Sequence, residues 1–297
     1  MTYPYQTIRK TLVTTLVTTL VTSLAISHVN AHEGTGRAGL KDTTGVEVEG
    51  EFYVGKRGYL HGGLGVITAL DAEQKVGVVG HFVREDTEGE IFPSLGAEYI
   101  RDLGDGYELE VFSFGYVPVE RQHAWAMGLR ADRTFEVNDH LSISPFFGPS
   151  FARVRAIEEA SDDPVGIGHL MLLGGFAVEA GPLEFTLFGS RSFFSRHPEG
   201  METHVDLEEM THFAAYENND GFARGTLGIE LAYPLTEWIT LEARYVWLTY
   251  DDRTRHAVTF APTLKLNSQW EVSAGIQLLR GDGPDNNLAV TGAAFSF

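Results

Sequence analysis

Hydrophobic and polar side chains alternate along most of the chain after residue 45. In the segment 238–248, Ile239, Leu241 and Ala243 alternate with Glu242 and Arg244. Successive side chains of a β-strand point to opposite faces, so a period of two predicts a strand between two unlike environments. The same alternation recurs in the segments 46–54, 222–233 and 270–279.

Short turns alternate with longer polar connections between these runs. The short turns are 71–74, 103–106, 137–140, 180–182, 234–237 and 266–269. The longer connections are 84–90, 118–123, 156–166, 196–221, 251–256 and 281–287, and only the first connection, 55–58, is tight. This layout is typical of a transmembrane antiparallel up-and-down β-barrel, with turns at one membrane surface and loops at the other.

The runs between these connections predict fourteen strands. They are 46–55, 59–70, 75–84, 91–101, 106–117, 123–135, 141–155, 166–179, 182–195, 222–233, 238–250, 255–266, 269–280 and 287–297. An even count brings both ends of the barrel to the same membrane surface. Four prolines lie inside these runs (Pro93, Pro145, Pro149 and Pro262), where proline cannot donate to the ladder. We expect bulges or strand ends there, and twelve strands remain an alternative.

The first residues have the pattern of a secretory signal peptide. Arg9 and Lys10 precede an uncharged apolar stretch, 11–26, and Val29 and Ala31 are the small residues of a cleavage site. The expected organisation is a signal peptide over 1–31, a periplasmic N-terminal segment over 32–44 and a single β-barrel domain over 45–297.

The composition excludes several classes of protein. The 297 residues contain no cysteine, so disulfides and thiolate metal sites are absent. The formal net charge of −19 argues against nucleic acid as a partner, because nucleic-acid-binding proteins are basic. The mean hydropathy of −0.09 excludes a bundle of membrane helices. A secreted soluble β protein and a membrane β-barrel remain.

Two features favour the barrel over a soluble sandwich. Charged residues such as Glu230, Arg244 and Glu271 lie in mid-strand, where a water-filled lumen tolerates them and a dry core does not. Aromatic residues collect at both ends of the strands, as two interfacial belts require. They are Tyr99, Tyr107, Tyr233, Trp238 and Trp270 near the short turns, and Phe52, Tyr59, Phe82, Trp125, Trp247 and Tyr250 near the loops.

The last strand carries a resemblance to a known class. The chain ends at Phe297, with Phe295, Ala293, Thr291 and Ala289 on the same side of the strand. This terminus resembles the C-terminal signal of Gram-negative outer-membrane β-barrel proteins, and the chain is similar in size to small fourteen-stranded monomeric porins. The resemblance implies a place in the cell outer membrane with periplasmic termini and extracellular loops. It also implies contact with outer-membrane lipids and lipopolysaccharide, and recognition of the last strand by the barrel assembly machinery.

Acidic residues dominate the predicted lumen face. The candidates are Glu47, Glu49, Glu51, Glu98, Glu108, Glu110, Glu179, Glu184, Glu230, Glu242 and Glu271, against the cations Arg130, Arg224, Arg244 and Lys265. Carboxylates concentrate cations and repel anions, so the sequence predicts a porin-like channel that passes small solutes by diffusion and prefers cations. In the alternative interpretation, acids and arginines form an ion-pair lattice that plugs the barrel.

Basic residues gather at the loop-side ends of the strands. This predicted rim consists of Lys56, Arg57, Arg84, Arg121, Arg153, Arg155, Arg191, Arg196, Arg253, Arg255 and Arg280. Guanidinium groups suit phosphate, so the outward-pointing members are candidates for binding lipopolysaccharide. Pairing with loop acids is the alternative.

The connection 196–221 has helical character. If 203–216 is a helix, His204, Glu208 and His212 lie on one face and offer ligands to a divalent metal. Two turns of helix separate the outer ligands by about 12 Å, too far for one ion without a bend. A loop folded into the barrel mouth as a constriction is the alternative.

No catalytic motif is present. The histidines that could serve an enzyme are His81 with Ser94, His169 with Ser150, and His256, and the sequence brings no complete catalytic set together. We therefore expect neither enzymatic activity nor a cofactor. Two alternatives to the channel remain open: a plugged barrel acting as a structural or lipopolysaccharide-binding surface protein, and a lipid-modifying outer-membrane enzyme.

Overall fold

A computed structural model describes residues 45–55, 60–84, 91–116, 123–158, 163–197, 201–202, 223–251, 253–282 and 286–296. The predicted signal peptide, 1–31, and the segment 32–44 lie outside these residues. In the part of the chain that is described, no helix has the length and apolar character needed to cross a bilayer.

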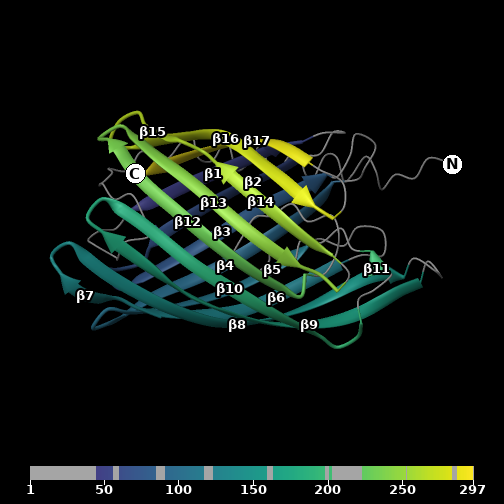
Figure 1. The fold of residues 1–297 in the computed structure, drawn as a ribbon. Coiled ribbons are helices and arrows are strands. Elements are labelled where there is room, and N and C mark those ends of the chain that lie inside the picture. The colour runs from purple at the N-terminus through teal and green to yellow at the C-terminus, as the bar shows by residue number, and fades with distance from the viewer. Residues whose placement is uncertain are drawn as a thin grey trace, which may run out of the picture.

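The described chain folds into one closed antiparallel β-barrel of fourteen strands, which confirms the predicted fold class and strand count (Figure 1). Three short elements complete the set: β7 continues β6, β15 continues β14, and β11 pairs with the loop-side end of β8. The elements are β1 (Val46–Val54), β2 (Leu60–Ala69), β3 (Gln74–Arg84), β4 (Phe92–Gly104), β5 (Tyr107–Tyr116), β6 (His123–Arg133), β7 (Phe135–Asn138), β8 (Leu141–Glu158), β9 (Asp163–Ala180), β10 (Leu183–Phe194), β11 (Met201–Glu202), β12 (Gly225–Thr236), β13 (Ile239–Thr249), β14 (Thr254–Phe260), β15 (Thr263–Lys265), β16 (Trp270–Gly281) and β17 (Asn286–Ser296).

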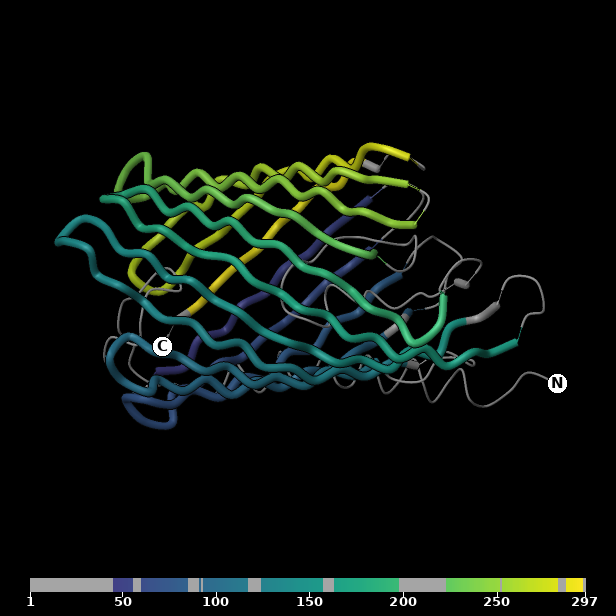
Figure 2. Tube along the Cα trace, turned by 60° about the horizontal axis from the view of Figure 1, so that its bottom comes forward, coloured from purple at the N-terminus to yellow at the C-terminus, as the bar shows by residue number. Residues whose placement is uncertain are grey.

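The barrel closes where the first strand meets the last. β1 pairs with β17 from Glu47↔Ser296 to Val54↔Ala289, and its other edge pairs with β2. Every other long strand pairs with its neighbours along the chain, so the topology is up-and-down and no long strand has a free edge. The strands run obliquely to the barrel axis, as Figure 2 shows. Closure satisfies the backbone groups that lipid cannot hydrogen-bond.

The prolines explain where the ladders break. β8 pairs with β6 at Gly128↔Ser150 and again at Ala131↔Phe147, and the gap between these pairs lies opposite Pro149. Pro145 lies opposite the point where β6 gives way to β7, and Pro262 separates β14 from β15. Proline has no N–H to donate, so each residue removes one ladder bond without ending the strand.

Side-chain hydrogen bonds shape the short turns. Asp71 accepts from the backbone N of Glu73 at 2.9 Å, Asn138 accepts from His140 at 2.9 Å, and Asn267 accepts from Gln269 at 2.8 Å. In the turn between β4 and β5, Gly104 has φ +81°, Asp105 +53° and Gly106 +76°, a left-handed conformation that glycine adopts without strain. We call this end of the barrel the turn side and the opposite end the loop side.

The outer face of the barrel is apolar. On β12, for example, Leu227, Ile229 and Leu231 are exposed, while the alternate residues Thr226 and Gly228 are buried on the inner face. Rings of both predicted belts are exposed on this face, among them Tyr107, Tyr233, Trp238 and Trp270 at the turn side and Phe52, Trp125 and Trp247 at the loop side. Tyr250 differs, because it packs against a cluster of buried inner-face residues, and Tyr59 lies outside the described residues.

Candidate functional site

The inner face of the barrel divides into two halves of different chemistry. The alternation within each strand decides which side chains point inward, and the register between strands arranges those side chains in rows around the barrel. The loop-side half of this inner face is largely apolar, and the turn-side half is acidic.

Buried apolar side chains line the loop-side half. They form two clusters, one on β5, β6, β8 and β9 and the other reaching from β9 through β10 and β13 to β16. The first consists of Phe114, Tyr116, Ala124, Ala126, Ala152, Val154, Ala156 and Ile167, and the second of Met171, Leu173, Phe188, Ala223, Val246, Leu248, Ala257 and Leu279. The charged residues predicted a generally acidic lumen, and the structure adds this apolar half.

Glutamates line the turn-side half in rows set by the register. Glu179 is the direct partner of Glu184, and Glu184 and Glu242 flank Ala232 from the two neighbouring strands. Glu49 and Glu271 flank Ala294 in the same way across the closure of the barrel. Like charges directly opposite each other destabilise a sheet, so the Glu179–Glu184 pair opposes stability, while the members of the other two pairs lie two strands apart.

Two arginines pair with part of this acidic surface. The Arg130 Nη2 atom lies 3.2 Å from Glu110 Oε2, and its Nε atom lies 3.6 Å from Asp132 Oδ2. The Arg244 Nε atom lies 2.8 Å from Glu230 Oε1. The two pairs differ in exposure: the Glu110 side chain is 4% exposed and the Glu230 side chain 40%.

The other predicted lumen residues also fall on inward positions of their strands. Lys265 is the register partner of Glu271, and Glu108 is that of Asp132. Glu47 and Glu98 share another row through Ile67 and Gly77, and Glu51 lies nearer the loop side. Two charged members of the same surface were missed in the sequence, Lys75 and Asp132. Both occupy inward positions of correctly predicted strands, so counting alternate residues from His81 and from Arg130 finds them.

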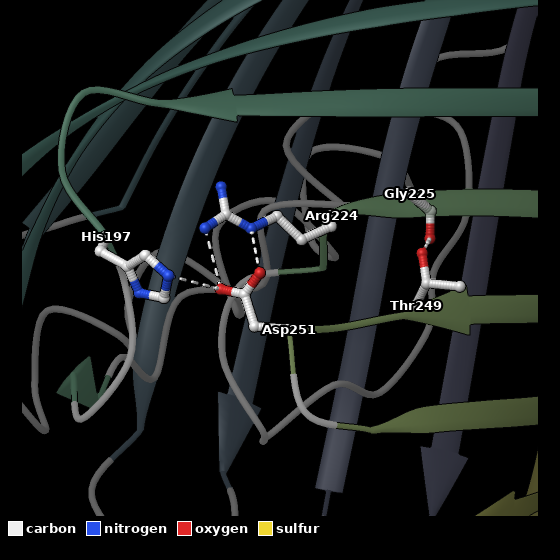
Figure 3. A network of polar contacts seen from close by, with 5 residues as sticks. All are labelled: His197, Arg224, Gly225, Thr249 and Asp251. Carbon is white, nitrogen blue, oxygen red and sulfur yellow. Dashed lines mark hydrogen bonds and ion pairs between the residues drawn. The ribbon is translucent and has the colours of Figure 1, made fainter.

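Arg224, predicted as a lumen cation, continues the inward alternation of Thr226 and Gly228, and its guanidinium lies over the Phe194 ring. Arg224 lies just before β12 at the loop side, where its Nε and Nη2 atoms donate to the two carboxylate oxygens of Asp251 at 2.7 and 2.8 Å (Figure 3). His197 Nε2 lies 3.6 Å from the same carboxylate. These contacts join the segments that follow β10, precede β12 and follow β13.

The Arg224 hydrogen bonds lower the pKa of Asp251 below its ordinary value, and the nearby charges of Arg224, His197 and Arg191 add to the effect. A lowered pKa means that this pairing stabilises the fold at pH values above the ordinary aspartate pKa. The contribution is lost as the pH falls through the lowered value.

The predicted basic rim is only partly directed outward. Arg153 and Arg155 on β8, like Arg84, Arg191 and Arg280, occupy outward positions near the loop-side ends of their strands. Arg255 is a wrong member of this set: its register partner is the inward Leu248 and it is 3% exposed, so it is buried on the inner face. Arg253 lies over the Tyr250 ring and Arg196 is exposed in the bend after β10. Lys56, Arg57 and Arg121 lie outside the described residues.

The predicted metal ligands His204, Glu208 and His212 also lie outside the described residues. Another group of ligand-type side chains does come together on the inner face. Glu51, His61 and His81, from β1, β2 and β3, place one donor atom each within 4.8 Å of one another.

The serine–histidine pairs considered for an enzyme do not form catalytic contacts within the described residues. Ser94 Oγ donates to the backbone carbonyl of His81 at 3.4 Å. The register partner of Ser150 is Met171, and the ring of His169 stacks on Phe194 with centroids 4.8 Å apart. His256 is on the outer face, where its Nδ1 shares a 2.6 Å hydrogen bond with the Tyr245 hydroxyl.

Neither a protein-family model nor a curated protein matches the chain in sequence. Solved structures do match it. The chain is similar to the structure described as the CymD monoaromatic hydrocarbon channel, with a TM-score of 0.52 and 8% identity over 90% of this chain and 94% of that one. It also matches the toluene transporter TodX of Pseudomonas putida (TM-score 0.48, 11% identity, 90% and 95% covered) and OprD of Pseudomonas aeruginosa (0.45, 9%, 91% and 99%). The likeness to CymD shows the same fold, a closed antiparallel β-barrel.

The difference in burial between the two arginine pairs gives a prediction. Replacing Arg130 by methionine leaves the buried Glu110 carboxylate without its nearest cation and is expected to cost about 3–5 kcal/mol of unfolding free energy. Replacing Arg244 by methionine frees a carboxylate that water reaches and is expected to cost about 1 kcal/mol or less. Urea unfolding of both variants in the same detergent measures the difference. Equal losses of unfolding free energy in the two variants would show that the Glu110 carboxylate is not desolvated.

Proposed function

We propose that this protein is a channel of the Gram-negative outer membrane that passes small solutes by diffusion and prefers cations. In this orientation the short turns and the termini face the periplasm and the loops face outward. The observation that carries the proposal is the turn-side inner face, where rows of glutamates outnumber the basic residues Lys75, Arg130, Arg244 and Lys265.

The acidic rows supply the electrostatic part of the mechanism. Low-dielectric walls focus the field of fixed charges into a pore, so carboxylates raise the local concentration of cations and lower that of anions. Arg130 and Arg244 neutralise only some of these carboxylates, while Glu49, Glu179 and Glu184 have no cation as a direct register partner. The unneutralised part of the surface is expected to set the selectivity.

The apolar loop-side half adds a second selection. Phe114, Met171, Phe188 and Val246 are only 0–4% exposed, so these side chains pack within the two clusters and narrow the interior at this level. A small solute is therefore expected to pass this half more easily than a large one.

A second role in binding lipopolysaccharide is supported by the outward arginines. Arg153 and Arg155 lie beside the loop-side aromatic belt, where Trp125 is the register partner of Arg153. Guanidinium groups bind phosphate with two parallel hydrogen bonds, and lipopolysaccharide presents phosphates at this level of the outer leaflet. This role is compatible with transport and also with a plugged barrel.

The channel proposal predicts a charge-dependent selectivity. In planar bilayers under a salt gradient, the reversal potential of the unmodified protein should indicate cation preference. In the double variant Glu49→Gln/Glu271→Gln the permeability ratio should fall by about twofold or more, because two carboxylates of one inner row are lost.

The control removes the same charge from two exposed turns, as Asp105→Asn/Glu237→Gln, and should leave the ratio unchanged. Anion preference of the unmodified channel would contradict the proposal. Absence of conductance would favour the plugged barrel instead.

The lipopolysaccharide proposal predicts that Arg153→Glu/Arg155→Glu reduces the lipopolysaccharide that co-purifies with the barrel by at least about half, because repulsion replaces phosphate binding. The matched control, Arg101→Glu/Arg133→Glu, reverses the charge of two arginines near the turn-side ends of β4 and β6. This variant should retain the lipopolysaccharide. Phosphate analysis of the purified proteins measures the amount. Equal lipopolysaccharide in both double variants would remove the idea.

A further inference from the structure

Glu51, His61 and His81 meet on the inner face because the register of β1, β2 and β3 brings them together. Glu51 and His81 both have Gly63 as their register partner, and His61 lies one row nearer the loops. Gly63 leaves the space between them open: a Cβ at this position would lie 2.7 Å from His81 Nδ1 and 3.4 Å from Glu51 Cγ. The glycine thus lets two side chains from opposite strands approach across the middle strand.

The distances within this trio suit a shared ligand. His61 Nε2 lies 3.4 Å from His81 Nδ1, and His81 Nδ1 lies 3.9 Å from Glu51 Oε1. Tetrahedral zinc holds its ligand atoms at about 2.0–2.1 Å, which separates neighbouring ligand atoms by about 3.3 Å. Small side-chain rotations therefore bring all three donors to ligand distance.

Aromatic packing holds the two imidazole rings. His61 is 4% exposed and stacks on Tyr53 with ring centroids 5.2 Å apart and an interplanar angle of 11°. His81 stacks on His61 at 5.6 Å and contacts Phe114 at 5.8 Å. Rings fixed in this way lose little conformational entropy on binding an ion.

Tyr53 also orients the carboxylate. Its hydroxyl donates to Glu51 Oε2 at 3.1 Å, while the other oxygen, Oε1, is the one that approaches His81. A hydrogen-bonded outer partner that positions a ligand is a regular feature of protein metal sites. The same tyrosine thus supports two of the three ligand residues.

We propose that Glu51, His61 and His81 form a binding site for a divalent transition-metal ion on the inner wall of the barrel. Two imidazoles and one carboxylate favour Zn²⁺ or Cu²⁺ over Mg²⁺ or Ca²⁺, which prefer oxygen ligands alone. Three protein ligands leave the fourth position of a tetrahedral ion for water or a solute. The site depends on the inner-face geometry and not on whether the barrel conducts, so it can be tested separately from the proposed channel.

The first test is Zn²⁺ binding to the full chain, purified in detergent without a polyhistidine tag and stripped with chelator. Isothermal titration with ZnCl₂ should give one site in the unmodified protein. Tyr53→Phe, which removes an outer partner, should weaken Zn²⁺ binding by about 10- to 100-fold. His61→Ala and His81→Ala should each weaken it more, because each removes a ligand.

Two controls address other histidines. His256→Ala removes an outer-face imidazole that stacks on Trp247 and should not change the affinity. His204→Ala/His212→Ala removes the ligands predicted from the sequence and should also leave it unchanged. The heat-dependent gel mobility of folded barrels verifies that each variant is folded before titration.

A spectroscopic measurement reports the ligands directly. Electron paramagnetic resonance of the protein loaded with one equivalent of Cu²⁺ should show two nitrogen ligands, and His61→Ala should show one. Equal Zn²⁺ affinity of the unmodified protein and folded His61→Ala, whether tight or weak, would overturn the proposal. Loss of the site in His204→Ala/His212→Ala instead would move the metal to the loop and overturn it as well.

Discussion

The requirement that every backbone N–H and C=O inside a membrane find a partner determines this structure. A sheet meets it only by closing, and here the pairing of β1 with β17 removes the last free edge. Closure then separates an outer face from an inner one, and the period of two along each strand assigns every side chain to one of them. The exposed leucines of β12 and the buried Gly228 between them follow from this single condition.

Closure also makes the inner face a surface that can vary along the barrel axis. Each strand places inward side chains at successive positions along its length, so those near the turn side can form one zone and those near the loop side another without disturbing the ladder. The glutamates at the turn side and the clusters around Phe188 and Val154 at the loop side are two such zones. In the proposed channel a solute passes the level narrowed by the apolar clusters and the acidic zone in series, and this order couples selection by size to selection by charge.

The sequence predicted the strands well because alternation is a local property. Ile239, Leu241 and Arg244 indicate both the strand and its two faces. The prolines that made the predicted boundaries uncertain interrupt single hydrogen-bond ladders without ending strands. What depends on the register between strands was not predicted. Arg255 was placed by its nearness to a loop, but its partner Leu248 turns it inward. The sequence did not predict a role for His61. Its approach to His81 and Glu51 depends on the register of β1, β2 and β3 and on Gly63 between His81 and Glu51, and no sequence motif marks either.

The central claim is that the outer face of the barrel contacts lipid and the inner face contacts water. Site-directed thiol labelling tests this claim most directly. The chain has no cysteine, so single cysteines can be introduced at neighbouring positions: E242C beside A243C on β13, and S273C beside A274C on β16. In vesicles, a membrane-impermeant maleimide should label E242C and S273C and leave A243C and A274C unlabelled. Labelling of the alanine positions with protection of the other two would contradict the account, as would labelling that does not follow the period of two.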